Sequence, residues 1–325
     1  MLTSRFVLFV FAVLVAAGLA GGCEQPSTSD VNQTDEGVVR LGSVEAVDTV
    51  ARAVAPSGRP LVIDGFRGRV DLEGGDTETA DLQFVRRARG ESAETARGVL
   101  EDVTITESGS EQNYTYTLET EGRAYAAVDV SGTVPRDAAL RIEQASGPVT
   151  IREVAGPLTV KHDHGPVTIR GASASVEVET KNGDLDVTLR SVPVDATIVL
   201  RTKNGDVTLR LPPDASAQFD AETSAGNVRT RGLALTEQEF LPREAGGEYA
   251  ARLGTGDASV ELHTENGSVL VQSVDTTTLD PGLDTLSPPP SDTTVTGPSA
   301  PDTVQAQDSL QAPDTTTAPA PDTTS

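Results

Sequence analysis

The chain of 325 residues is poor in aromatic residues, in cysteine and in lysine. It has no tryptophan, and aromatic residues make up only 3% of it, which argues against a large aromatic binding pocket. The single cysteine excludes disulfide bonds within the chain and metal sites built on several cysteines. Of the 25 basic residues only three are lysines, at Lys161, Lys181 and Lys203. The 30 glycines and 20 prolines argue against a mainly helical protein.

Positive charge is also scarce, because 25 basic side chains stand against 49 acidic ones and the formal net charge is −24. A protein that binds nucleic acid needs a surface rich in lysine and arginine to contact phosphates. We therefore expect no nucleic-acid partner.

Residues 1–22 have the composition of a signal peptide. One charge, Arg5, precedes a short apolar run, and small residues follow up to Cys23. Such a run is too short for a typical membrane-spanning helix. The segment Leu19-Ala20-Gly21-Gly22-Cys23 resembles the lipobox of bacterial lipoproteins, in which the cysteine is lipidated and becomes the new N-terminus. The alternative is an ordinary secretory cleavage that leaves Cys23 free. Residues 23–36 have almost no apolar side chains and are expected to form a tether after the lipidated cysteine.

Residues 275–325 form a tail without lysine, arginine, glutamate or aromatic residues, and Pro-Asp-Thr recurs within it. Such a segment cannot bury enough apolar area to offset the entropy of ordering it, so we expect the tail to be disordered. Its repeated Asp-Thr and Asp-Ser pairs resemble acceptors of O-glycosylation in some bacterial envelopes. The alternative is a plain Thr/Pro/Asp-rich linker.

Residues 140–274 combine regularly spaced glycines with strict alternation of apolar and polar residues, as in Val149-Thr150-Ile151-Arg152. The glycines recur nine residues apart or at about twice that interval, at Gly147, Gly156, Gly165, Gly183 and Gly205. The alternation predicts short strands with one buried face, and Asn-Gly pairs mark turns. A repeat of about 18–22 residues with two strands each is typical of stacked coils. We therefore predict an all-β fold, a β-solenoid or β-helix-like repeat. The alternative is an antiparallel β-meander or sandwich, because Asn-Gly also forms tight hairpins.

Residues 37–139 are expected to form a β-rich N-terminal part that closes one end of the stack. Strand patterns occur at residues 61–65, 68–72, 82–85, 103–105, 114–118 and 125–130. The segment 91–101 is the one good helix candidate, since Ala93, Ala96 and Leu100 share helical spacing.

The segments Thr180-Lys181-Asn182-Gly183-Asp184-Leu185 and Thr202-Lys203-Asn204-Gly205-Asp206-Val207 echo one another. Together with Gly132-Thr133-Val134-Pro135 and Thr223-Ser224-Ala225-Gly226-Asn227, they resemble the bacterial DUF4097 family of β-strand repeat proteins. The resemblance covers about residues 37–272. It implies surface exposure and adhesion, and some family members accompany envelope-stress regulators.

Few residues have the pattern of a reactive site. His162-Asp163-His164 has metal-ligand side chains at alternate strand positions, although a solvated turn at the corner explains the motif better. Asp184, Asp186 and Asp206 could form an acidic row beside Lys181 and Lys203, as in glycan-active β-helix enzymes. The alternative is a corner ladder that sets the turns. We expect no catalytic residue, no cofactor and no metal, and Cys23 is the one site that we assign, for lipidation.

These features predict a non-enzymatic envelope lipoprotein that acts in adhesion, scaffolding or surface recognition. Its proposed binding face carries alternating polar residues, namely Thr150, Arg152, Thr168, Arg170, Thr188, Arg190, Thr208 and Arg210. Expected partners are the membrane, through the lipid anchor, and an envelope glycan or surface protein. The expected location is the bacterial cell envelope, with an outer membrane favoured where there is one. The alternatives are a glycan-active enzyme on the same scaffold and a sensor or regulator of envelope stress.

Overall fold

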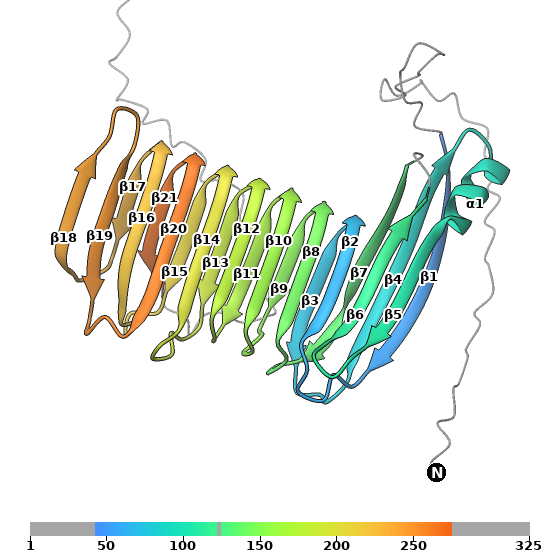
Figure 1. Ribbon diagram of the computed structural model, residues 1–325, viewed down its shortest axis with the longest axis horizontal. Helices are drawn as coiled ribbons and strands as arrows, with labels where there is room; N and C mark the ends of the chain where they lie inside the picture. Colours follow the sequence, from blue (N-terminus) through green and yellow to red (C-terminus); the bar gives the residue numbers. More distant parts are fainter. Residues whose placement is uncertain (1–42, 122–124, 275–325) are drawn as a thin grey trace, which may run out of the picture. The chain divides into compact units, whose positions relative to one another are not determined.

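The computed structural model describes residues 43–121 and 125–274, which lie in one compact unit. The signal peptide, Cys23, the tether and the tail fall outside these residues. Within the described part, two large β-sheets and one short helix make up the fold (Figure 1). None of the described helices is long and apolar enough to cross a bilayer.

The first sheet, called sheet A, has ten strands. In spatial order they are β1 (Val44–Val54), β4 (Ala80–Gly90), β7 (Ala126–Pro135), β3 (Val70–Gly75), β9 (Val149–Arg152), β11 (Val167–Ala172), β13 (Leu185–Leu189), β15 (Val207–Leu211), β21 (Val269–Ser273) and β17 (Val228–Arg231).

The second sheet, called sheet B, has eleven strands. In spatial order they are β18 (Leu235–Pro242), β19 (Gly247–Leu253), β16 (Ala217–Ala225), β20 (Ala258–Asn266), β14 (Thr197–Asn204), β12 (Val176–Asn182), β10 (Leu158–His164), β8 (Leu140–Ser146), β2 (Leu61–Arg67), β6 (Tyr114–Thr120) and β5 (Val103–Gly109).

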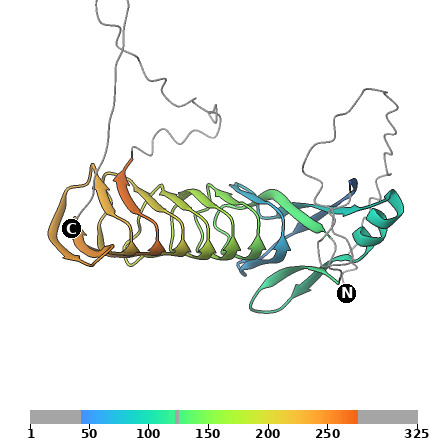
Figure 2. The same ribbon diagram turned by 90° about the horizontal axis from the view of Figure 1, so that it is seen from above.

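Each coil of the stack contains one strand of sheet B followed by one strand of sheet A. Successive coils pair in parallel and in register, so that Leu158 of β10 faces Leu140 on one side and Val176 on the other. Figure 2 shows from above how these coils stack one after another. Parallel pairing confirms the predicted β-solenoid and is not the pairing of an antiparallel meander.

The core lies between the two sheets and runs along the whole stack. The alternating apolar residues point inward, as the sequence predicts, and form one continuous cluster from Leu61 to Val271. Ile169, Val187 and Leu209 are completely buried in neighbouring coils of sheet A. Burying one such side chain stabilises a fold by about 1.5–3 kcal/mol, so the stacked apolar columns hold the coils together.

The coils do not stack in the order of the sequence. The first coil, β2–β3, lies between the coils β6–β7 and β8–β9. The last coil, β20–β21, lies between β14–β15 and β16–β17. Each of these two coils therefore pairs on both sides. The coils β6–β7 and β16–β17, which are less close to the ends of the sequence, lie further out in the stack.

Antiparallel strands close both ends of the stack. At one end β4 pairs antiparallel with β1 and β7, and β5 pairs antiparallel with β6. The helix α1 (Ala93–Glu101) lies in the predicted segment, begins after the N-cap Ser92 and contacts β4 and β1. At the other end the hairpin β18–β19 pairs with β16. Residues before 140 thus supply the cap and also two coils, β2–β3 and β6–β7.

A tight turn at a glycine carries the chain from sheet B to sheet A in seven coils, those whose turns the structure describes. The turn glycines stack on one another as Gly68, Gly147, Gly165, Gly183, Gly205, Gly267 and Gly226. Their φ angles are positive, and a Cβ atom at Gly183 would lie only 1.9 Å from the carbonyl oxygen of Gly165. The predicted Asn-Gly turns therefore serve as corners between sheets, where no larger residue fits. We call this edge of the stack the glycine corner.

Candidate functional site

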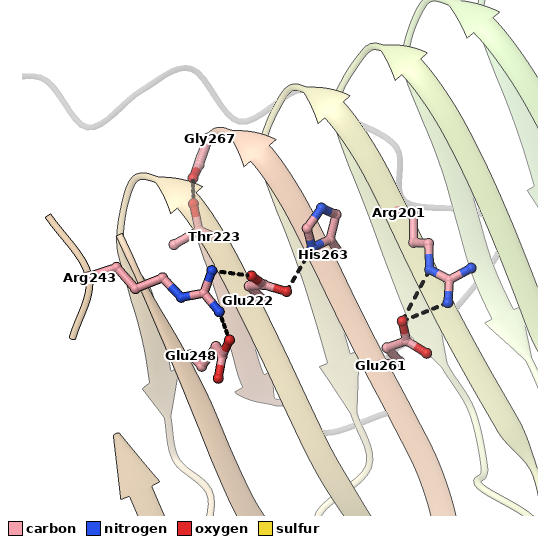
Figure 3. A network of polar contacts seen from close by, with 8 residues as sticks. All are labelled: Arg201, Glu222, Thr223, Arg243, Glu248, Glu261, His263 and Gly267. Carbon is pink, nitrogen blue, oxygen red and sulfur yellow. Dashed lines mark hydrogen bonds and ion pairs between the residues drawn. The ribbon is translucent and has the colours of Figure 1, made fainter. Parts of the chain in front are cut away.

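A row of buried polar side chains lies inside the glycine corner. It consists of Gln144, His162, Thr180, Thr202, Thr264 and Thr223 on successive coils. The Thr264 hydroxyl donates to the carbonyl of Gly205 at 2.9 Å. The Thr223 hydroxyl donates to the carbonyl of Gly267 at 2.8 Å, and Figure 3 shows this second bond. These bonds satisfy carbonyl oxygens inside the corner, so Thr264 and Thr223 have an architectural role, whereas the buried hydroxyl of Thr180 has no hydrogen-bond partner.

The acidic row that the sequence suggested lies outside the same corner. The Asp184 carboxylate accepts a hydrogen bond from the backbone N–H of Asp206 at 2.9 Å. The Asp206 carboxylate accepts in turn from the N–H of Ser268 at 2.7 Å. Asp186 lies on the outer face of sheet A and pairs with Arg210. All three carboxylates thus join neighbouring coils, as a corner ladder does.

The two histidines of His162-Asp163-His164 have different surroundings. The His162 ring is buried, with its Nδ1 atom 2.8 Å from the backbone oxygen of Gln144. Burial lowers the pKa of His162, and hydrogen bonds with backbone groups partly oppose this shift. His164 is exposed, with its Nδ1 atom 3.0 Å from the amide nitrogen of Asn182. Among residues 43–121 and 125–274, no three His, Cys, Asp or Glu side chains are grouped so that they could hold a metal ion.

The predicted arginine face is only partly assembled. Arg152 and Arg170 are neighbours on sheet A, and Thr188 separates Arg170 from Arg210. Arg190 lies beyond the end of β13, where it pairs with Glu153. Arg152 contacts Asp71 at 2.5 Å, and Arg210 pairs with Asp186 as described above. Neighbouring carboxylates neutralise Arg152, Arg190 and Arg210, so sheet A does not present a free arginine column.

The three lysines of the chain meet on the other sheet. Lys161, Lys181 and Lys203 belong to β10, β12 and β14, which are neighbours in sheet B, and all three are exposed. They line one shallow depression of about 430 Å³ beside the glycine corner, together with Arg201 and His263. We call this depression the lysine groove.

Three acidic residues in and around the lysine groove, Glu179, Glu261 and Asp163, have cationic partners of their own. Arg201 lies 2.6 Å from Glu261 and 3.4 Å from Glu179, and Figure 3 shows the first of these contacts. The hydrogen bond to Glu261 raises the pKa of Arg201 above its usual value. Lys181 lies 2.8 Å from Asp163. These contacts fix one wall of the groove.

A second set of ion pairs continues from the groove toward the end of sheet B (Figure 3). His263 Nδ1 lies 3.4 Å from the Glu222 carboxylate. Arg243 contacts the same carboxylate at 3.0 Å and also pairs with Glu248. These residues belong to different strands, β20, β16 and β19, and to the β18–β19 loop, so the outer face of sheet B is cross-linked by charge.

Two lysines of the groove lack an ion-pair partner among the described residues. Lys161 and Lys203 have none within the part of the chain that the structure describes, in contrast to Lys181. The arrangement can therefore attract an anion, although the molecule as a whole is strongly acidic. Sequence reasoning missed this site. The one available signal was that all the lysines lie about one coil apart.

No curated protein matches this chain. Among solved structures, it is similar to a candidate cell adhesion protein from Clostridium sporogenes, with a TM-score of 0.40 and 12% identity over 70% of this chain and 100% of that chain. It is also similar to a candidate adhesin from Bacteroides fragilis, with a TM-score of 0.34 and 11% identity over 70% of this chain and 97% of that chain. The part from β7 to the end of the stack, residues 126–272, matches the model of the Toastrack DUF4097 family.

Proposed function

We propose that this protein is a non-enzymatic envelope lipoprotein that recognises a surface partner, in adhesion or scaffolding, through its solenoid. The observation that carries this proposal is the lysine groove, which gathers every lysine of the chain on one face of sheet B. In a chain with a net charge of −24, the gathering of all three lysines on one face supports a local binding surface there.

The scaffold supports recognition better than catalysis. Asp184 and Asp206 use their carboxylates to accept backbone hydrogen bonds between coils. A carboxylate held in this way is poorly placed to act as a nucleophile or general base. The long parallel ladders in turn provide a rigid surface, which lowers the entropy cost of binding.

Export and lipidation at Cys23 complete the proposal and rest on the sequence of residues 1–22. Mass spectrometry of the protein isolated from its native membrane provides the test. We expect a diacylated or triacylated Cys23 as the first residue of the mature chain. An unmodified chain cleaved elsewhere would overturn the lipid anchor.

Surface recognition is tested by incubating the labelled full chain with isolated cell envelopes and measuring its retention. We expect saturable retention that an excess of unlabelled chain competes away. The same envelopes are analysed for released sugars, because release of glycan fragments would contradict a non-enzymatic role. A matched variant, Asp206→Asn, should retain binding.

A further inference from the structure

The lysine groove is well suited to one class of partner. We infer that it binds an acidic polysaccharide that lies across β10, β12 and β14 along the axis of the stack. The inference rests on the proposed function and names the ligand class of the same surface.

The groove extends in the direction in which the coils repeat. Lys161, Lys181 and Lys203 lie on three consecutive strands of sheet B, and parallel strands are spaced about 4.8 Å apart. Lys181 and Lys203 occupy equivalent positions, since Thr180 pairs with Thr202 and Asn182 with Asn204. A polymer with a charged group on successive units can therefore meet successive coils.

Charge in the groove favours an anion. Four cationic side chains, Lys161, Lys181, Lys203 and Arg201, line the groove together with three carboxylates, Asp163, Glu179 and Glu265. Arg201 pairs with both Glu179 and Glu261, and Lys181 pairs with Asp163. Lys161 and Lys203 remain without an ion-pair partner among the described residues. An ammonium group forms short, charge-assisted hydrogen bonds with carboxylate or sulfate oxygens, which are stronger than bonds between neutral groups.

The remaining lining of the groove suits a sugar better than a membrane. The side chains that it exposes are charged ones and His263, and they include Glu265 as a hydrogen-bond acceptor. A surface that binds a bilayer adds apolar side chains that enter the lipid, and the lining contains none. Sugar hydroxyls donate to carboxylates and accept from ammonium groups, so this polar lining matches them.

The test measures binding of the full chain to a galacturonic acid oligosaccharide and to dextran sulfate. The uncharged controls are the methyl-esterified oligosaccharide and plain dextran. We expect at least one acidic probe to bind, with affinity that falls as salt is added, and neither uncharged probe to do so. The double variant Lys161→Gln/Lys203→Gln should weaken binding at least about tenfold. Arg229→Gln, an exposed arginine on sheet A, should leave binding unchanged.

The lysine content of the chain provides a second readout. Because all three lysines line the groove, an amine-acylating reagent modifies side chains only there. Mass spectrometry of the acylated chain should show that the bound acidic probe protects Lys161 and Lys203. Thermal unfolding of the double variant at the wild-type temperature would show that its fold is intact.

The outcomes separate the groove from the proposed function. If the double variant is retained on envelopes as well as the wild type is, the groove is not the binding site, and surface recognition by another part of the chain still stands. Loss of retention on envelopes, with acidic probes still bound and lysines protected, would overturn surface recognition alone. Binding to vesicles of anionic lipid but to neither acidic probe would overturn the polysaccharide in favour of a membrane.

Discussion

At the scale of single residues, the glycine corner depends on a hydroxyl group. Thr264 is completely buried, and its hydroxyl donates to the carbonyl of Gly205. Thr202 and Thr223 make equivalent bonds to Gly183 and Gly267. A buried carbonyl that loses its donor costs more than the bond contributes, because no water replaces the lost partner.

Substituting Thr264→Val therefore tests the row of threonines. Valine keeps the shape of the side chain and its preference for strands but removes the donor. We expect the free energy of unfolding to fall by about 1–3 kcal/mol, measured by urea denaturation. The control is Thr208→Val on the outer face of sheet A, which should change it by less than about 0.5 kcal/mol. Equal effects at both positions would refute the role of the hydroxyl.

His162 makes the stability of the protein depend on pH. Burial lowers its pKa below the usual 6.5, so the unfolded chain binds a proton in a pH range where the folded chain does not. Its contribution to stability is thus complete above about pH 6.5 and is lost as the pH falls toward the folded-state pKa. Denaturation between pH 7.5 and 5 should show a smaller pH slope in His162→Gln. An unchanged slope would assign the titration to another group.

At the scale of elements, glycine has opposite roles in the corners and in the helix. A Cβ atom at Gly183 would overlap the carbonyl oxygen of Gly165, whereas Gly98 in α1 has nothing within 4 Å of the same atom. The corner has no room for a side chain at Gly183, whereas the helix has room for one at Gly98.

The matched pair Gly183→Ala and Gly98→Ala follows from this contrast. The first should lower the melting temperature, because a strained φ alone costs about 1–3 kcal/mol and the overlap adds to that. The second should raise stability by up to about 1 kcal/mol, since alanine favours a helix interior. Calorimetry measures the melting temperature of both variants. A Gly183→Ala variant that melts at the wild-type temperature would contradict the close stacking of the corner glycines.

The exchanged order of the coils changes which segments are protected. Strands β20 and β21 come last in the stack by sequence, yet each pairs on both sides. Strand β18 pairs only with β19. Hydrogen exchange should therefore be slow at Leu262 and Val271 and much faster at Phe240. Fast exchange throughout residues 258–273 would show that the last coil opens from the chain end.

At the scale of the whole described unit, the open edges of a solenoid invite association with other chains. Strand β18 is an edge strand with two exposed apolar side chains, Phe240 and Leu241. A shift of register after Thr236, the charge of Glu239 and Pro242 at the strand end all oppose further pairing. At the other end, α1 lies against β1 and β4.

The double substitution Glu239→Val/Pro242→Val removes two of these protective features. We expect it to increase association that depends on protein concentration, as measured by sedimentation velocity, because a flat apolar edge pairs with another copy. Asp220→Val, on an inner strand of sheet B, controls for the loss of one charge. Association of the control to the same extent would assign the effect to net charge instead of the edge.

The sequence by itself determined the local structure of this protein. Alternation of apolar and polar residues predicted the strands, Asn-Gly pairs predicted the turns, and residues 91–101 contain the observed helix. These features follow from contacts between residues close in sequence or in adjacent repeats. For the same reason the position of Asp184 beside Asp206 in neighbouring coils was predictable.

Only the tertiary structure decided the order of the coils and the site that this order creates. Every coil offers the same backbone donors and acceptors. The local pattern therefore does not specify that β20–β21, and not β16–β17, pairs with the coil β14–β15. The lysine groove depends on the register between β10, β12 and β14, which places Lys161 two residues from the position that Lys181 and Lys203 share. Which distant segments pair depends on how the whole apolar column packs, and the sequence of a single repeat does not determine that packing.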